Sequence, residues 1–370
     1  MIMALDHTRE LLHVSSLSED PTNLATTTPG LFFTRWITHL CAPIFVFLSG
    51  TSVYLQLKRR DEVNEVQRFL FFRGVLLIFL EMTIVNFGIW FDPLYRTLMF
   101  QVIFAIGAGF VLLSLLLRLP SRTLLLLGLL IITGHNLLDQ LKFGKSFGEE
   151  LVRYLFYPTF LKGDYLTFFQ PYPIIPWLGI MLFGFGFGEV YFIDRKKRNK
   201  ILLLSGVSFL VVFLVLRWGN IYGDPALWRT QSTGLFTFLS FMNLTKYPPS
   251  LLYTSVTLGV MFLVLMVSEN ESSINKLLVI YGRVPLFFYV VHWYVIHISM
   301  LVLVLLQGYS WNEMSFVSFG FGRPGSGPSG VELPWVYAYW VSLLVLMYIL
   351  CQWFGSYKAA HPEKGWLTFF

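Results

Sequence analysis

The chain has 370 residues, of which 55% are hydrophobic, 18% are aromatic and only 13% are charged. Soluble globular proteins carry about a quarter charged residues, so this composition excludes an ordinary soluble domain. The net charge of +6 does not indicate nucleic-acid binding. The basic residues gather in short connections between apolar runs, where they orient helices in a membrane. We therefore expect an integral membrane protein with the lipid bilayer as a partner and no nucleic acid.

Long apolar runs recur along the chain, and as helices they can cross a hydrocarbon core of about 30 Å. The alternating segments typical of membrane barrels are absent from the sequence. We predict an all-α, polytopic transmembrane helical bundle of about ten membrane helices, forming a single domain over residues 1–370. A short first helix near 3–13 is followed by expected helices at 34–57, 69–91, 98–117, 123–142, 173–193, 201–217, 248–267, 284–306 and 334–353.

The first predicted helix is unusually short, because a polar loop begins at residue 14 and extends to 33. No signal peptide is indicated, since the charged residues follow the apolar ones. We expect that the natural chain begins upstream or that this helix enters the membrane only partly. Further along, the aromatic-rich loop before Tyr172 is expected to contain a short interfacial helix, and residues 268–283 are expected to be an interfacial connector.

The two cysteines, Cys41 and Cys351, both lie inside predicted membrane helices. This placement supports neither a disulfide framework nor a cysteine-based metal site. The sequence also lacks an HExxH motif, Cys/His metal spacing and a serine elbow, so we predict no metal and disfavour hydrolases of those types.

Basic residues are concentrated in the short connections on one side of the predicted bundle. The positive-inside rule therefore places the RKKRNK run at 195–200 and the C-terminus in the cytoplasm, with the long loops outside. The basic side chains of this run are weak candidates for contacting a phosphorylated cytosolic ligand, although topology alone explains them. They are Arg195, Lys196, Lys197 and Arg198. The sequence leaves the oligomeric state open, a homodimer included.

Ionisable side chains in predicted membrane helices are the strongest indication of function, because each costs roughly 2.5 to 3.5 kcal/mol near the bilayer centre. The first helix carries Asp6, His7 and Glu10, and the second carries Arg35 and His39. Histidines from several helices fall between mid-membrane and the outer surface, which predicts a shared polar chamber. They are His7, His39, His135, His292 and His297. The alternative is that each histidine only bonds a neighbouring helix.

Further polar groups lie at similar depth. His135 and Asp139 are one turn apart on one helix face, which fits either the chamber or a polar helix end facing water. Glu81 lies deeper and either has a function or pairs with Arg73. Asp6, Glu10 and Asp139 are the acids available to orient an imidazole or accept its proton.

The GFGFG run at 184–188 lies inside an apolar segment and not after a strand, so it is not a phosphate loop. The spacing of Gly184 and Gly188 instead predicts close packing against a neighbouring helix.

An ordered set of motifs resembles the bacterial relatives of heparan-alpha-glucosaminide N-acetyltransferase, a family of transmembrane acyltransferases. The motifs are MALDHTRE, WITHLCAPIFVFLSG, GHNLLD, YPIIPWLGIMLFG, LTKYPPSLL and GRVPLFFYVVHWYVIH. The resemblance covers nearly the whole chain. It implies an enzyme of the bacterial cytoplasmic (inner) membrane that takes an acetyl group from cytosolic acetyl-CoA and delivers it to an amine or hydroxyl of a sugar or glycan across the membrane.

The resemblance also implies site residues. His7 and His39 fall at matching positions on the first two helices, and His292 matches a histidine on a late helix. The loop histidine regarded as catalytic in the family has no clear counterpart within 14–33. The family's usual preceding stretch, with its Asp-x-x-Arg-Gly-like pattern, is also missing here.

We hypothesise an acyltransferase, for an acetyl or another acyl group of an acyl-CoA, in which His39 or His7 is the general base. Asp6 would orient one imidazole, and Arg35 or Asn136 would stabilise the oxyanion. Direct transfer and an acetyl-histidine intermediate both stay open. The rival hypothesis is a proton-coupled transporter in which the buried histidines and acids form a relay.

Overall fold

A computed structural model describes residues 1–60, 62–144, 146–269, 273–325 and 327–369. Within these residues, eight helical segments are long and apolar enough to cross a membrane. They are Pro29–Arg59, Val63–Trp90, Ser121–Gln140, Ile174–Phe192, Arg195–Gly219, Leu251–Ser268, Pro285–Leu306 and Leu333–Ala360. A further apolar helix, Val102–Leu116, is shorter. The predicted all-α polytopic membrane bundle is therefore confirmed.

The helices are α1 (Ile2–Leu12), α2 (Pro29–Thr38), α3 (Cys41–Arg59), α4 (Val63–Leu80), α5 (Asn86–Trp90), α6 (Val102–Leu116), α7 (Ser121–Gly134), α8 (Phe147–Phe156), α9 (Ile174–Phe187), α10 (Arg195–Gly219), α11 (Gly234–Met242), α12 (Leu251–Ser268), α13 (Ser273–Arg283), α14 (Pro285–Leu306) and α15 (Leu333–Ala360). The strands are β1 (Thr97–Met99), β2 (Thr159–Lys162), β3 (Thr167–Gln170), β4 (Met314–Ser315) and β5 (Arg323–Pro324). Of the connector expected at 268–283, residues 270–272 lie outside the described residues.

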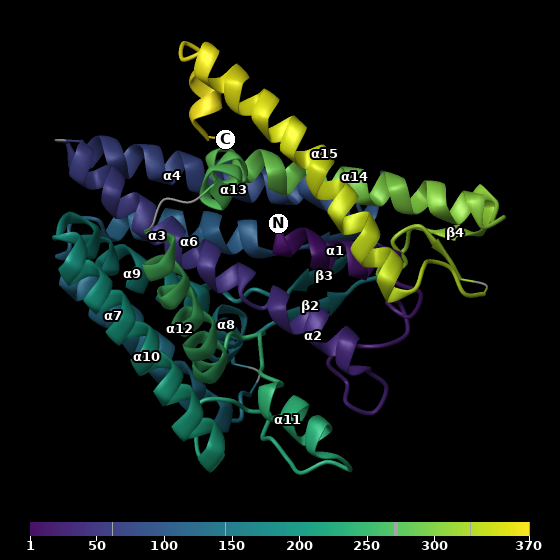
Figure 1. The fold of residues 1–370 in the computed structure, drawn as a ribbon, viewed down its shortest axis with the longest axis horizontal. Coiled ribbons are helices and arrows are strands. Elements are labelled where there is room, and N and C mark those ends of the chain that lie inside the picture. The colour runs from purple at the N-terminus through teal and green to yellow at the C-terminus, as the bar shows by residue number, and fades with distance from the viewer. Residues whose placement is uncertain (61, 145, 270–272, 326, 370) are drawn as a thin grey trace.

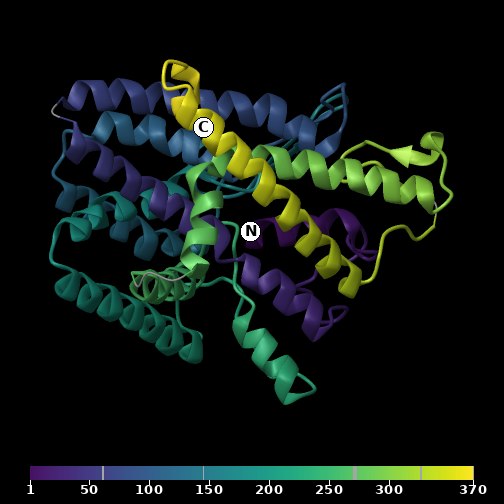
Figure 2. The same ribbon diagram turned by 45° about the horizontal axis from the view of Figure 1, so that its top comes forward.

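The long helices pack against one another as neighbouring pairs. α4 packs on α6, α7 and α3 both pack on α9, and α10 packs on α12 (Figure 1). α15 crosses the bundle diagonally and contacts α14 and α1 (Figure 2). The short α1 lies near the middle of the molecule in both views. This arrangement brings the charged first helix into the interior of the bundle.

The chain bends between α2 and α3, within the range where the sequence predicted one helix at 34–57. α2 begins earlier than expected because Pro29 suits a first helical position and the Thr28 hydroxyl accepts a bond from the Leu31 backbone N–H. The regular helix stops at Thr38, and the His39 N–H bonds to the Trp36 carbonyl at 3.0 Å. The bend lies directly beside the predicted site.

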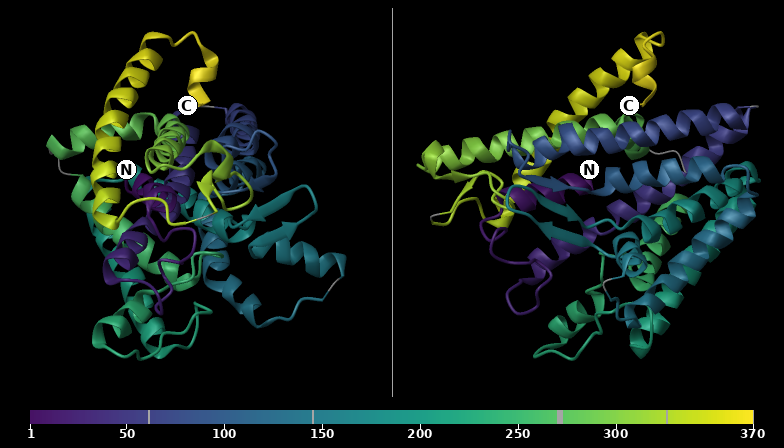
Figure 3. Two further views of the ribbon diagram at one scale, coloured as in Figure 1. Left: turned by 90° about the vertical axis from the view of Figure 1, so that its right-hand side faces the viewer. Right: turned by 180° about the vertical axis from the view of Figure 1, so that it is seen from behind.

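A small sheet was not predicted from the sequence. β3 pairs in parallel with β1 and antiparallel with β2, so segments far apart in the chain meet in one sheet. Figure 3 shows these strands to one side of the helices. The short helix expected before Tyr172 is present as α8, and a reciprocal Ser146–Glu149 capping box fixes its start.

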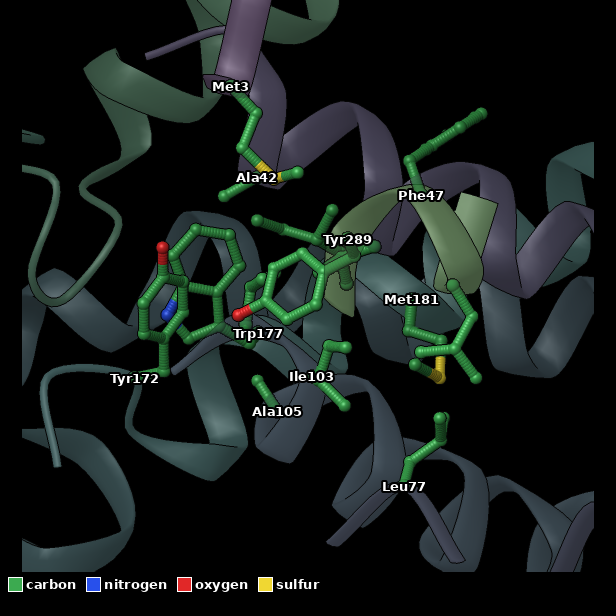
Figure 4. Packing of buried hydrophobic residues seen from close by; sticks show 14 of the residues in the cluster. Met3, Ala42, Phe47, Leu77, Ile103, Ala105, Tyr172, Trp177, Met181 and Tyr289 are labelled. Carbon is green, nitrogen blue, oxygen red and sulfur yellow. The ribbon is translucent and has the colours of Figure 1, made fainter. Parts of the chain in front are cut away.

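The predicted close packing of Gly184, on α9, and of Gly188, directly after α9, is confirmed. A Cβ atom at Gly184 would collide with the Phe47 carbonyl of α3, and one at Gly188 would collide with the Tyr54 side chain. The Thr51 hydroxyl uses this proximity to donate to the Gly184 carbonyl at 2.9 Å. Figure 4 shows Phe47 and other side chains of the packed core close to this seam. The contact holds α3 at a fixed depth against α9.

We expect the Gly184→Val substitution to destabilise the protein by about 1–3 kcal/mol, because the new side chain forces α3 away from α9. The change in stability is measured as the difference in melting temperature in detergent. Size-exclusion chromatography follows. Gly355→Ala is the matched control, since a Cβ there meets open space. Equal melting temperatures for G184V and the unsubstituted protein would contradict this account of the seam.

Candidate active site

An internal cavity of about 160 Å³ lies where α1, α2 and α3 meet the chain segments that precede α9 and α12. It lies in the part of the bundle where the chain bends after α2. Apolar side chains form part of its wall. Its polar lining residues are Asp6, His7, Glu10, Arg35, Thr38, Gln101, Tyr172, Lys246 and Tyr247. The cavity is the best candidate for a reaction site because its acids, bases and cations converge in a small buried space.

The spacing of charges along α1 produces two side-by-side pairs. Asp6 and Arg9 are three residues apart, as are His7 and Glu10, so each pair shares one stripe of the helix surface. The Arg9 guanidinium donates to Asp6 at 3.1 Å, and His7 Nδ1 lies 3.3 Å from a Glu10 carboxylate oxygen. The Asp6–Arg9 pair is therefore purely ionic, whereas the imidazole of the His7–Glu10 pair can accept and release a proton.

Asp6 joins α1 to α2 through a second ion pair. Its other carboxylate oxygen accepts a hydrogen bond from Arg35, so one buried acid lies between two guanidinium groups. α1 is not among the membrane-spanning candidates. Burial raises the pKa of Asp6, but Arg35 and Arg9 outweigh this effect and hold the pKa well below its ordinary value. Asp6 is thus a fixed anion that positions Arg35, and Glu10, not Asp6, contacts the His7 imidazole.

His7 is held between α1 and α14. Its ring lies 3.8 Å from the Trp293 ring and 5.3 Å from the His292 ring, measured between centroids. His292 is fully buried, and its Nδ1 donates to the Phe288 carbonyl at 3.0 Å. The structure therefore brings His7 and His292 together, with His7 lining the cavity.

His39 lies at the bend after α2 and is buried. Its carbonyl accepts a hydrogen bond of 2.8 Å from the Tyr253 hydroxyl, and its ring lies 5.5 Å from the Tyr253 ring. The lining set does not include His39. His39 is close to Arg35 in the chain, but its side chain faces α12.

The group at the end of α7 forms a separate polar cluster. The Asn136 amide donates to Asp139 at 2.8 Å and accepts from the Leu251 N–H at 2.9 Å. His135 Nδ1 lies 2.9 Å from the Ile131 carbonyl. These bonds connect α7 to the start of α12, and these side chains do not belong to the lining set.

Two further predicted groups lie apart from the lining. His297 stacks on Phe91 with ring centroids 4.0 Å apart. Glu81 is fully buried and accepts a hydrogen bond of 2.8 Å from the Gln101 backbone N–H. Arg73, the partner considered for Glu81, instead lies 5.8 Å from the Phe110 ring centroid.

The basic run at the start of α10 is partly engaged within the protein. Arg198 donates to Glu269 at 2.8 Å, and Arg195 lies 3.5 Å from the same carboxylate. Lys196 and Lys197 are exposed. The two arginines thus connect the start of α10 to the end of α12.

Sequence reasoning missed part of the cavity wall. Lys246, Tyr247 and Tyr172 lie in connections and not in predicted helices, so the cost of burying a polar group in a membrane did not single them out. Gln101 was not singled out, because it was predicted to lie near the start of a helix. A usable signal was present in LTKYPPS, where a lysine and a tyrosine directly precede the Pro-Pro pair that leads into α12.

The fold and the site define a polytopic helical membrane protein with a buried acid–base chamber. Within the part of the chain that the structure describes, no group of three or more His, Cys, Asp or Glu residues is arranged to hold a metal ion.

Residues 10–222 match the family described as heparan-alpha-glucosaminide N-acetyltransferase, catalytic. The match covers more than half of the chain, and the chain belongs to this family of membrane acetyltransferases. A comparison with curated proteins finds no significant match.

We expect Asp6→Asn to lower the free energy of unfolding by about 3–5 kcal/mol, because Arg9 and Arg35 would stay buried without their counter-charge. Denaturant titration in detergent measures the change. Asp164→Asn provides the control, since Asp164 lies on the exposed side of the β2–β3 turn. If D6N and D164N unfold at the same denaturant concentration, the ion pair does not stabilise the fold as argued.

Proposed function

We propose that this protein transfers an acetyl group from acetyl-CoA to an amine or hydroxyl of a sugar or glycan. Family membership supports acetyl transfer. The observation that carries the proposal is the His7–Glu10 pair, which lines a buried cavity beside the Arg35 guanidinium. A base and a cation facing one small space are what an acyl transfer requires.

His7 is the general base in this proposal. With Nδ1 beside the Glu10 carboxylate, Nε2 is the nitrogen that takes the proton from the attacking amine or hydroxyl. Glu10 orients the ring and stabilises the imidazolium that forms. His39 is the weaker candidate for the base, because it is absent from the cavity lining. The same geometry serves direct transfer or a His7-bound acetyl intermediate.

Arg35 stabilises the negative charge that develops on the acetyl carbonyl oxygen. It lines the cavity, and Asp6 fixes its orientation from α1. A guanidinium has five N–H donors, so bonding to Asp6 leaves others for the oxyanion. Asn136, the other candidate, already bonds to Asp139 and Leu251 outside the lining.

The donor nucleotide is proposed to bind at the far end of α3. A second, open hollow of about 350 Å³ is lined there by Arg59 and Arg60, with Ser52 and Gln56. Guanidinium groups suit phosphate oxygens. At 1.5 Å per residue, α3 covers about 21 Å between Arg59 and the cavity-lining Phe45, so an elongated thioester is needed to join the two sites. This hollow replaces residues 195–198 as our preferred phosphate contact.

The positive-inside rule places this end of α3, the basic run of α10 and the C-terminus in the cytoplasm. The acceptor would then approach from the outer side of a bacterial cytoplasmic membrane. Acetyl groups would cross through the cavity without free diffusion of the donor.

We expect His7→Gln and Glu10→Gln to lower kcat for acetyl transfer, by about 10²- to 10⁴-fold for H7Q, because the acceptor loses its base. Labelled acetyl-CoA, purified protein and a pool of amino sugars and sugars are incubated, and products are read by mass spectrometry. His361→Asn in the tail is the control. His39→Ala is expected to lose less activity than H7Q, and the reverse order would assign the base to His39.

The same assay tests the function itself. A thioester-dependent acetylated product supports the proposal. Sugar uptake that follows a pH gradient, with no thioester consumed, would contradict the proposal. The function would then be proton-coupled transport by the same buried groups.

A further inference from the structure

The cavity has a second polar wall that the proposed base and oxyanion donor do not use. Lys246 and Tyr247 lie just before α12, and Tyr172 lies just before α9; all three line the cavity. The Lys246 ammonium is 5.1 Å from the centroid of the Tyr247 ring. The Tyr247 hydroxyl donates to the Tyr172 hydroxyl at 3.4 Å, a long bond that is readily exchanged for a substrate atom.

Lys246 gives this wall a positive charge. Only 9% of its surface is exposed, and its ammonium lies over the aromatic ring of Tyr247. A buried ammonium that lies against a phenol favours the phenolate form of that phenol. Figure 4 shows Tyr172 beside Trp177, with Tyr289 close to them, so other aromatic rings pack against Tyr172.

The two phenols on this wall differ in acidity. Burial raises the pKa of Tyr247, but Lys246 and Arg35 outweigh burial and leave the pKa below its ordinary value. Burial raises the pKa of Tyr172. The titratable groups that face Tyr247 are Lys246 beside it, Arg35 on α2, Tyr172 before α9, Tyr253 on α12, Tyr289 on α14, and Asp6, His7 and Glu10 across the cavity on α1.

We propose that Tyr247 is the general acid of the transfer, giving its hydroxyl proton to the departing thiolate while Lys246 stabilises the phenolate. This inference rests on the function proposed above. It divides the cavity into a basic wall on α1 and an acidic wall before α12. An acid and a base on opposite sides of a reacting carbonyl allow both proton transfers without bulk water.

The step balances without another reactant. As the acceptor lone pair bonds to the carbonyl carbon, the acceptor proton moves to His7 Nε2. As the intermediate collapses, the carbon–sulfur bond breaks, its electron pair goes to sulfur, and the Tyr247 proton joins that sulfur. The proton held by His7 then returns to the Tyr247 phenolate through water in the cavity. The products are the acetylated acceptor and free thiol.

The test compares two donors in the full-length protein in lipid nanodiscs. Acetyl-CoA releases a weakly acidic thiol, whereas the acetyl thioester of nitrothiophenol releases a much more acidic thiol, whose thiolate leaves without protonation. We expect Tyr247→Phe to lower kcat about 10²-fold with acetyl-CoA and less than about threefold with the aryl thioester. Tyr172→Phe removes a neighbouring phenol hydroxyl and is expected to leave the ratio between donors unchanged.

A pH profile with acetyl-CoA gives a second readout. A general acid works only while protonated, so the rate of the unsubstituted protein falls as the pH rises through the Tyr247 pKa. We expect Y247F to lose this alkaline fall, and Lys246→Met to move it to higher pH because the phenol loses its neighbouring cation.

Equal loss with both donors would overturn the assignment and make Tyr247 an oxyanion donor or a structural residue. An alkaline fall that persists in Y247F would also overturn it. These failures differ from failure of the proposed function, in which the unsubstituted protein transfers no acetyl group from acetyl-CoA.

Discussion

The placement of Asp6 between Arg9 and Arg35 is the interaction on which the site depends. A helix with several charges cannot be buried in an apolar bundle unless those charges are paired. The Asp6 carboxylate pairs with both guanidinium groups and joins α1 to α2. Because His7 follows Asp6 directly, the same bonds fix the rotation of α1 that directs His7 toward the cavity and Trp293.

The rest of the bundle holds the opposite walls in place. The glycine seam between α3 and α9 sets the position of α3, which contributes Cys41, Ala42 and Phe45 to the cavity. The chain before α12 is held by Asp224, which accepts hydrogen bonds from Thr245 and Ser250 on either side of Lys246 and Tyr247. Each wall is therefore positioned by buried polar bonds or by close helix contact, which suits a site that must keep its groups at fixed distances.

The sequence predicted the helices better than it predicted which side chains contact one another. Apolar runs gave the helical bundle, and the cost of membrane charges singled out α1 and α2. The sequence also placed several histidines at one depth in the membrane, but depth does not specify the direction in which a side chain points. His135 therefore contacts the Ile131 carbonyl, and His297 stacks on Phe91. The acid that contacts His7 is Glu10 and not Asp6.

Two kinds of feature could not be read from local patterns. The β1–β3 pairing depends on long-range contact. Lys246 and Tyr247 lie in a loop, where polar residues carry no penalty until the tertiary fold buries them.

The central claim is that the cavity beside His7 is where the acetyl group is transferred. An experimental structure with a non-reactive acetyl-CoA analogue tests this most directly. We predict that the nucleotide lies near Arg59 and Arg60 and that the acyl end enters the cavity between His7 and Tyr247. Density for the acyl end at the His135–Asp139 cluster, or anywhere outside the cavity, would contradict it.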